Sequence, residues 1–418
     1  MPSKNFIYLY YGVLLVILTS WTSVTSSPPF PLRLAFLLAV IIPSLRRDDG
    51  FLPVVLSFFW ALTSNGYSYS YMPTSEYLYV IVLILAILFR KTRTQRLSLK
   101  DMRLWYFFFF FVLIVNVILQ QSIARISYTT LVVMLFPLFI VDDNKQVIDK
   151  FSDMFIILTI IISLYAILLK DNDTIMMYAD TDRVSWVDPN YMGAQIGMGA
   201  LVGIINILKF NRINLFRKIL SPLAIVLAIP AVLLTGSRGA ALCLFVGIIV
   251  LIFSTKGKFV YKLLAIVLLS LFVMYLYSDN YFELLSSRIE ADDGTGAGRT
   301  LIWKTKLKAF YDSNPIHWII GYGNKGGLAL GYTRELGCHN DFVAFLCMYG
   351  IVGLVSFLAL IISPLKRMNK KSSDRFEIIA CSVYLFSAFL TLEPMESGVI
   401  TFYVFLFYVY LKSKFSWY

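Results

Sequence analysis

Apolar runs long enough to cross a bilayer recur along almost the whole chain, and they constrain its fold more than any other feature. A transmembrane helix needs about 20 mostly apolar residues, because the hydrocarbon core of a bilayer is about 30 Å thick. Such runs lie near residues 6–24, 32–45, 51–66, 75–90, 104–121, 126–141, 151–169, 190–208, 219–235, 239–254, 259–277, 339–363, 377–392 and 397–413. Several are short, so the sequence predicts an all-α polytopic membrane protein with about 12 to 14 transmembrane helices.

Composition supports this prediction and excludes other classes. Of 418 residues, 58% are hydrophobic and 15% are charged, whereas soluble domains carry about 25% charged residues. The net charge of +12 fits Lys and Arg collecting in cytoplasmic loops, so we expect no nucleic-acid partner. The four cysteines show no paired spacing and only two histidines are present. These counts predict no disulfide framework, no metal site and no cofactor.

Basic loops set the expected orientation of the chain. They lie at residues 90–103, 209–218, 256–262 and 366–375, and with the full set of spans they all fall on the side of the N-terminus. Because basic loops stay in the cytoplasm, we expect both termini to be cytoplasmic. We expect residues 1–24 to remain attached as the first span, since no clear small-x-small cleavage site follows them.

The loops divide the chain into three regions. Residues 1–169 and 364–418 are expected to be N- and C-terminal transmembrane helices. Residues 170–363 carry the outer loops, the larger of which spans about 278–338. A transporter driven by ions usually has charged residues at the bilayer midplane. The predicted spans carry charge only near their ends, for example at Asp341 and Glu377, which argues against such a transporter.

One part of the larger outer loop has helical spacing. Between Thr300 and Tyr311, the side chains of Trp303, Leu307 and Phe310 share a face. Such a helix either lies at the membrane surface or packs on the helix bundle. The sequence does not decide between these two arrangements.

Polar residues converge on the outer face in four segments: Arg183–Asn190, Thr235–Gly239, Arg288–Asn324 and Gly337–Asp341. The helices that begin near residues 190, 239 and 340 all run inward, so their positive N-terminal ends face outward together. The arginines at 183, 238, 288 and 299 can join them. Such a cluster suits a phosphate or diphosphate.

Each of these features also has a plainer interpretation. An arginine at a span end is often an interface anchor. A Gly-Ser-Arg-Gly segment is often only a tight turn, and a histidine at a helix start is often a cap or a packed residue. Their convergence on one face favours a functional site.

Several stretches of the chain resemble the O-antigen ligase and polymerase family of bacterial envelope glycan synthesis. They are Thr235-Gly-Ser-Arg-Gly-Ala-Ala-Leu, Gly298-Arg-Thr-Leu-Ile-Trp, Ile320-Gly-Tyr-Gly and His339-Asn-Asp-Phe-Val-Ala-Phe-Leu-Cys-Met-Tyr-Gly-Ile-Val-Gly-Leu. Asp188-Pro-Asn190 also resembles the upstream segment of the family. The stretches occur in the family's order across a large outer loop, within residues 183–360.

The resemblance implies glycosyl transfer on the outer side of the bacterial cytoplasmic (inner) membrane, from an undecaprenyl-diphosphate-linked oligosaccharide donor. A polymerase of O-antigen, capsule or exopolysaccharide passes the glycan to a lipid-linked repeat unit, whereas a ligase passes it to the lipid A core. Membrane lipids, a flippase and a chain-length regulator are the further partners to expect. The family needs no metal.

The same resemblance assigns roles to individual residues. The family's loop histidine and arginines map onto His339, onto Arg238 and onto either Arg288 or Arg299. We therefore expect His339 and Arg238 to be catalytic. Residues expected to bind the diphosphate or the glycan are Arg183, Asp188, Arg288, Arg299 and Asn340.

Physical chemistry gives these residues a mechanism. Departure of a diphosphate needs stabilised negative charge, which arginines and helix N-termini supply. The attacking sugar hydroxyl needs a base, and a helix N-terminus with nearby arginines keeps His339 neutral for that task. Direct attack predicts inversion at the anomeric carbon. Asp188 and Glu393 are reserve bases, although an acid on a short loop such as Glu393 is more commonly exposed.

Three other readings of the function stay open. The first is the ligase, which shares all of these motifs; we prefer the polymerase because no feature marks a lipid A-core site. The second is a flippase or transporter for lipid-linked glycan, which typically lines its cavity with charge. The third is a non-catalytic scaffold, which would not need His339 and clustered arginines on one face.

Overall fold

The computed structural model describes a large part of the chain after residue 101. The described residues are 102–119, 144–168, 177–178, 181–184, 189–209, 213–255, 263, 266–267, 270–271, 274, 277–278, 283–290, 294, 296, 298–323, 337–368, 374–395 and 400–415. The spans expected before residue 102 and the span expected near 126–141 lie outside the described residues.

Apart from one short hairpin, the described part of the chain is helical. The helices are α5 (Arg103–Ile118), α7 (Asn144–Leu168), α8 (Pro189–Leu208), α9 (Leu215–Leu234), α10 (Arg238–Ser254), α12 (Glu283–Glu290), α13 (Arg299–Tyr311), α14 (Pro315–Ile320), α16 (Asp341–Arg367), α17 (Arg375–Thr391) and α18 (Ile400–Phe415). In the loop before α8, where the sequence indicated no strand, β1 (Met177–Tyr178) pairs antiparallel with β2 (Thr181–Val184).

Helix length and composition confirm the predicted class, an all-α polytopic membrane protein. Among the described residues, α7, α8, α9 and α16 are long and apolar enough to cross a membrane, and α5 and α10 are shorter apolar helices. The expected runs 190–208 and 239–254 match α8 and α10 to within a residue. Residues 339–363 became α16, which is interrupted at Gly350 by a non-helical conformation with φ of 65°.

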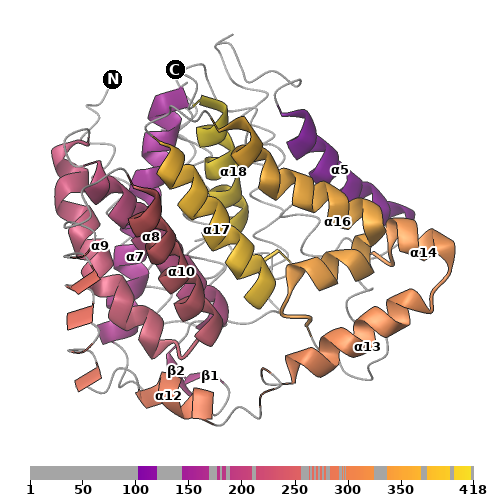
Figure 1. Cartoon of the computed structure of the whole chain (residues 1–418), viewed down its shortest axis with the longest axis horizontal. Helices are drawn as coiled ribbons and strands as arrows, with labels where there is room; N and C mark the ends of the chain where they lie inside the picture. Colours follow the sequence, from indigo (N-terminus) through magenta and orange to yellow (C-terminus); the bar gives the residue numbers. More distant parts are fainter. Residues whose placement is uncertain are drawn as a thin grey trace, which may run out of the picture.

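The helices form a bundle with two sides (Figure 1). On one side, α8 packs against α7, α9 and α10. On the other, α16 packs against α5, and α13 and α14 lie along its N-terminal half. Between them run α17 and α18, with α17 in contact with both α10 and α16. The bundle therefore brings α10 and α16 to opposite flanks of one helix.

Aromatic side chains fill the interior between α5, α16 and α18. The Trp105 ring centroid lies 4.9 Å from that of Phe407, and Phe345 stacks on Phe357 at 4.6 Å. All four side chains are 1% exposed or less. Tilted and stacked aromatic pairs at these separations stabilise a core beyond the area they bury.

Close approach to α8 depends on its glycines. A Cβ on Gly199 would overlap the Thr159 hydroxyl of α7, and one on Gly193 would lie 2.8 Å from the Thr235 hydroxyl oxygen. A Cβ on Gly203 would lie 3.2 Å from the carbonyl oxygen of Ser221 on α9. Small residues allow helix backbones to pack closely in membranes, where the hydrophobic effect does not drive helices together.

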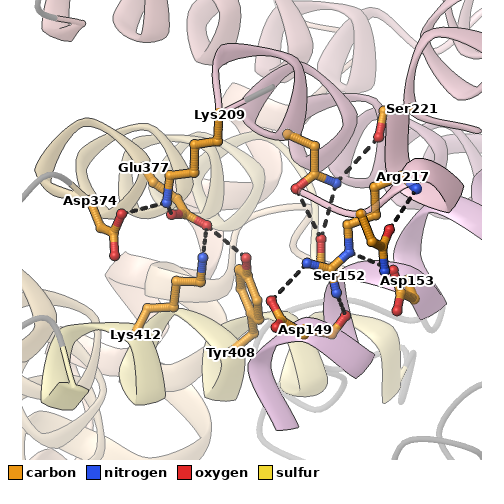
Figure 2. A network of polar contacts seen from close by, with 12 residues as sticks. Asp149, Ser152, Asp153, Lys209, Arg217, Ser221, Asp374, Glu377, Tyr408 and Lys412 are labelled. Carbon is orange, nitrogen blue, oxygen red and sulfur yellow. Dashed lines mark hydrogen bonds and ion pairs between the residues drawn. The ribbon is translucent and has the colours of Figure 1, made fainter. Parts of the chain in front are cut away.

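A buried ion-pair network lies at the end of the bundle where α8 stops and α17 starts (Figure 2). Glu377, in the first turn of α17, is 1% exposed and pairs with Lys209 and with Lys412 of α18. Tyr408 donates its hydroxyl to Glu377 over 2.7 Å. Burial alone lowers the pKa of Lys209, but Glu377 and Asp374 outweigh burial and raise it above its usual value. Lys209 therefore stays protonated.

A second network at the same end joins α7 to α9 (Figure 2). Arg217 Nη1 lies 2.7 Å from Asp149 Oδ1, and its Nε lies 2.6 Å from Asp153 Oδ1. The sequence placed Glu377 at the end of a span but did not indicate either network. Their partners come from helices that only the fold brings together.

Candidate active site

The starts of α8 and α10 are joined by hydrogen bonds at the opposite end of α8 from the ion pairs. Gly236 takes a φ of 58°, which turns the chain from α9 into α10. Ser237 then caps α10, because its Oγ accepts the Ala240 N–H over 3.2 Å. The same hydroxyl donates to Asn190 Oδ1 of α8 over 3.0 Å. Arg238 is consequently the first residue of a helix whose start is fixed to that of α8.

The start of α10 lies directly against the end of α17. A Cβ on Gly239 would sit 2.9 Å from Leu392 Cδ2 and 3.4 Å from the Thr391 carbonyl oxygen. The Cys243 sulfur is 3.5 Å from the Thr391 hydroxyl oxygen. Only glycine leaves room for this approach. The segment Thr391–Met395 begins at the last residue of α17 and is called the outer hub below, after the side on which the sequence predicts it.

Arg299 reaches the outer hub from the large outer loop. It opens α13 immediately after Gly298, which has a φ of 79°. Its Nη1 donates to the Thr391 carbonyl oxygen over 2.8 Å. The last carbonyls of a helix lack partners within it and carry partial negative charge. A guanidinium therefore suits this position.

The outer-loop helix α13 packs on the bundle, one of the two arrangements that the sequence left open. Trp303 Nε1 donates to the Cys338 carbonyl oxygen over 2.7 Å, and Phe310 packs against Cys347 of α16. Leu307, which we expected on the same face, is instead 40% exposed. The contact through Trp303 fixes α13 beside the segment that precedes His339.

His339 is held in a strained backbone conformation. Its φ of 50° is the only positive φ of a residue other than glycine in the described part of the chain. Its N–H donates to Glu393 Oε2 of the outer hub over 2.8 Å. A Cβ on Gly337 would lie 2.8 Å from that carboxylate oxygen, so the glycine makes room for it. Strain of this kind clusters at functional sites.

The residues after His339 start α16 and also contact the outer hub. Asn340 caps the helix, accepting the N–H groups of Phe342 and Val343 over 2.9 and 3.2 Å. Asp341 is fully buried and accepts the Met395 N–H over 3.3 Å. Asn340 thus has a structural task in addition to the glycan-binding role predicted from sequence.

Glu393 differs from its expected environment. The more common outcome for an acid on such a loop is exposure, but its side chain is only 2% exposed. It is buried because it approaches Gly337 and accepts the His339 N–H. The sequence held no signal for this contact, since the two residues are 54 positions apart.

The Gly-Tyr-Gly stretch of the outer loop has a structural role. At the break in α16, the Cys347 and Met348 carbonyls accept the N–H groups of Tyr322 and Gly323 over 3.1 and 2.7 Å. A Cβ on Gly321 would overlap the Met348 peptide, and one on Gly350 would overlap the Ile319 peptide. The backbones of the Gly-Tyr-Gly stretch and of α16 are therefore in direct contact here. This contact explains why both segments carry glycine.

The predicted site residues fall into two groups. Contacts at the outer hub bring together the segments that carry Arg238, Arg299 and His339, and Figure 1 shows the end of α17 between α10 and the start of α16. Arg183 lies on β2 and Arg288 on α12, but their side chains lie outside the described residues, as does the whole of Asp188. Within the described residues, no group of His, Cys, Asp and Glu side chains has a metal-binding arrangement.

Sequence reasoning named Glu393 only as a reserve base and did not indicate the contacts that the outer hub makes. Thr391 and Glu393 each contact a segment that carries a predicted site residue, yet neither belongs to a recognisable motif. Their positions follow from the packing of α17 between α10 and α16. A buried acid next to a helix end becomes visible as a partner only once the fold is known.

Comparison with known proteins concerns the same region. Residues 223–358 match the model of a protein family described as O-antigen ligase. The matched segment includes Arg238, Arg299 and His339 and ends before the outer hub. No curated protein matches the chain. The match covers about a third of the chain, and over these residues the chain is similar to the O-antigen ligase family.

Proposed function

We propose that this protein is a polysaccharide polymerase. It transfers a glycan from undecaprenyl diphosphate to a hydroxyl of a lipid-linked repeat unit, on the outer side of the bacterial cytoplasmic membrane. Members of the family are membrane enzymes that transfer glycosyl groups. The donor, the acceptor, the orientation and the catalytic residues are our proposal.

One observation carries the proposal: the N-termini of α10 and α16 and the segment of Arg299 meet at the outer hub, and the start of α8 is hydrogen-bonded to that of α10. Helix N-termini carry the positive ends of the helix dipoles. Three of them with two arginines make a preorganised site for a diphosphate leaving group. Binding at such a site strengthens as the bridging bond breaks and negative charge develops.

The reaction proceeds in one displacement. The acceptor hydroxyl attacks the anomeric carbon while the bond from that carbon to the diphosphate oxygen breaks. The hydroxyl proton passes to His339, and undecaprenyl diphosphate leaves with its charge held by Arg238 and Arg299. As a general base, the imidazole must be neutral to accept the proton. Arginines supply the positive charge that a metal supplies in other glycosyltransferases.

A single displacement inverts the anomeric configuration. The expected linkage therefore has the opposite configuration to the donor's glycosyl diphosphate bond. Nuclear magnetic resonance of the polymer and of the lipid-linked repeat unit measures both. Retention of configuration would exclude direct attack and require a glycosyl-enzyme intermediate.

The description of the matching family favours a second candidate, an O-antigen ligase. Such an enzyme uses the same donor chemistry but transfers the glycan to the lipid A core. The two candidates differ in acceptor and share the catalytic residues. Deleting the gene in its host separates them. Surface lipid with a single repeat unit indicates a polymerase, whereas long glycan accumulating on undecaprenyl diphosphate indicates a ligase.

Substitutions test the enzymatic function itself. We expect His339→Ala and Arg238→Ala to abolish long glycan on gels while the protein still accumulates in the membrane. Arg375→Ala is a matched control, because Arg375 is an exposed arginine at the opposite end of α17 from the outer hub. Normal chain length in both site variants would refute a role of these residues in catalysis.

A further inference from the structure

Lys306 on α13 is a buried lysine whose ammonium group has no hydrogen-bond partner among the described residues. Its side chain is 1% exposed. In the part of the chain that the structure describes, its Nζ has no hydrogen-bond or carboxylate partner. An ammonium removed from water costs free energy unless an acceptor replaces the water. An acceptor is therefore expected at this position.

The other buried cations show that this protein pairs such charges internally. Glu377 pairs with both Lys209 and Lys412, and Arg217 pairs with two aspartates of α7 (Figure 2). Lys306 is at least as buried as any of them, and yet no carboxylate among the described residues pairs with it. Within the described residues it has no such partner, which leaves an anion from outside the chain as a candidate.

The position of Lys306 links it to the candidate active site. Arg299, Trp303, Lys306 and Phe310 follow one another at helical spacing and share one face of α13. Arg299 and Trp303 bind the outer hub and the segment before His339. The Lys306 carbonyl oxygen lies 3.9 Å from the Cys347 sulfur on α16, and its ammonium is in electrostatic range of that thiol.

The lysine therefore lies along α16, beside the site and not within it. Cys347 follows Asp341 by six residues, which corresponds to about 9 Å along a helix axis. Apolar neighbours at this contact include Phe310, Tyr322 and Val343. A charge in such surroundings is weakly screened, so it attracts an anion more strongly than a surface lysine does.

We propose that Lys306 binds an oxyanion of the lipid-linked glycan substrate, which makes the contact between α13 and α16 an anion subsite beside His339. The proposal rests on the function proposed above. An ammonium presents a compact charge with three donors, which suits a phosphate or a carboxylate oxygen. Two parts of the substrate offer such oxygens: the diphosphate of the carrier, and the carboxylate of an acidic sugar.

The test compares Lys306→Met with Lys304→Met in the full-length protein purified in detergent. Lys304 lies on the same helix and is exposed, so it is a matched control. The thermal unfolding midpoint of each protein is measured with increasing inorganic pyrophosphate, with a glucuronate-terminated disaccharide and with its neutral glucose counterpart. A ligand that binds the folded state raises this midpoint.

We expect one anionic probe to raise the midpoint of the wild type and of K304M, and to bind K306M about tenfold or more weakly. A response to pyrophosphate assigns the subsite to the carrier, and a response to glucuronate assigns it to an acidic sugar. The neutral sugar should have no Lys306-dependent effect. Equal responses in wild type and K306M, or no response to either anion, would overturn the proposal.

The thermal unfolding midpoint of K306M without any probe shows whether Lys306 binds a ligand or stabilises the fold. Removing an unpaired buried charge should leave the midpoint of K306M unchanged or higher, whereas a lower midpoint would show that the lysine serves the fold. If K306M does not accumulate, Lys306→Gln repeats the test, and failure of both variants also overturns the proposal. Probe binding needs no turnover, so H339A should keep it. The subsite and the enzymatic function can therefore fail separately.

Discussion

His339 occupies a backbone conformation that L-residues seldom adopt, and its neighbours hold it there. The Glu393 carboxylate accepts its N–H, and Gly337 leaves space for that carboxylate. Asn340 starts the following helix within one residue. The position of the proposed base is thus determined by backbone contacts on both sides.

The first prediction concerns Glu393 as a positioning residue. We expect Glu393→Ala to lower kcat about tenfold or more, because a buried N–H that loses its acceptor costs about 1–3 kcal/mol. KM for the donor should change little. Glu393→Gln should retain most activity, since its amide oxygen accepts the same N–H. Rates of polymer formation in membranes from the three strains measure both effects.

The two variants also separate positioning from proton transfer. If E393Q is as inactive as E393A, the negative charge matters and Glu393 acts as an acid or base. Wild-type rates in E393A would remove it from the site altogether.

Predictability from the sequence differs sharply between these residues. Arg238, Arg299 and His339 stood out because each lies at the start of a predicted helix or beside a glycine turn. Thr391 did not, and Glu393 was named only as a reserve base, because their contacts are with residues 92 and 54 positions away. Local patterns cannot contain such information.

Among the elements, the interrupted helix α16 connects the outer loop to the bundle. The break at Gly350 frees carbonyls that Tyr322 and Gly323 then satisfy. Unpaired carbonyls inside an apolar bundle would be costly. The break and the Gly-Tyr-Gly stretch therefore depend on each other.

The second prediction follows from this dependence. Gly350→Ala should lower the free energy of unfolding by about 3 kcal/mol or more, because it combines a positive φ with overlap against the Ile319 peptide. Gly294→Ala is the matched control: its φ is 84°, but nothing lies within 4 Å of an added Cβ. It should cost only about 1 kcal/mol. Unfolding midpoints in detergent compare the two, and equal losses would contradict the overlap.

The positions of the helices could be predicted from the sequence better than any other feature of the structure. Apolar runs placed α8, α10 and α17 to within about two residues, because membrane spans depend on local composition. The β1–β2 hairpin was not predicted, since its short polar segments lack the alternation that marks a strand. The break in α16 was also missed, because a glycine within an apolar run is common in membrane helices.

For the molecule as a whole, charge is concentrated at one end of the bundle and the candidate site at the other. Glu377 joins the ends of α8, α17 and α18 through Lys209, Lys412 and Tyr408. Because Glu377 is buried, solvent and salt screen these pairs weakly.

The third prediction uses this network. Glu377→Leu should destabilise the protein by about 3–5 kcal/mol, because two largely buried ammonium groups lose their partner. Replacing all three charges together, as K209M, E377L and K412M, should recover much of that loss. Asp374→Asn is the control, since that side chain is 34% exposed and should contribute less than about 1 kcal/mol. Chemical unfolding of the wild type and these three variants measures the differences, and a stable E377L single variant would contradict the prediction.

The path of α17 connects these two ends. Its 17 residues span about 25 Å, with Glu377 clamped by charge at the start and Thr391 contacting α10 and Arg299 at the finish. The helix is therefore held at both ends. A shift of its charged N-terminal end would be transmitted along its axis to the backbone contacts at its C-terminal end. A tilt of α17 would therefore move, together, the contacts that position Arg238, Arg299 and His339.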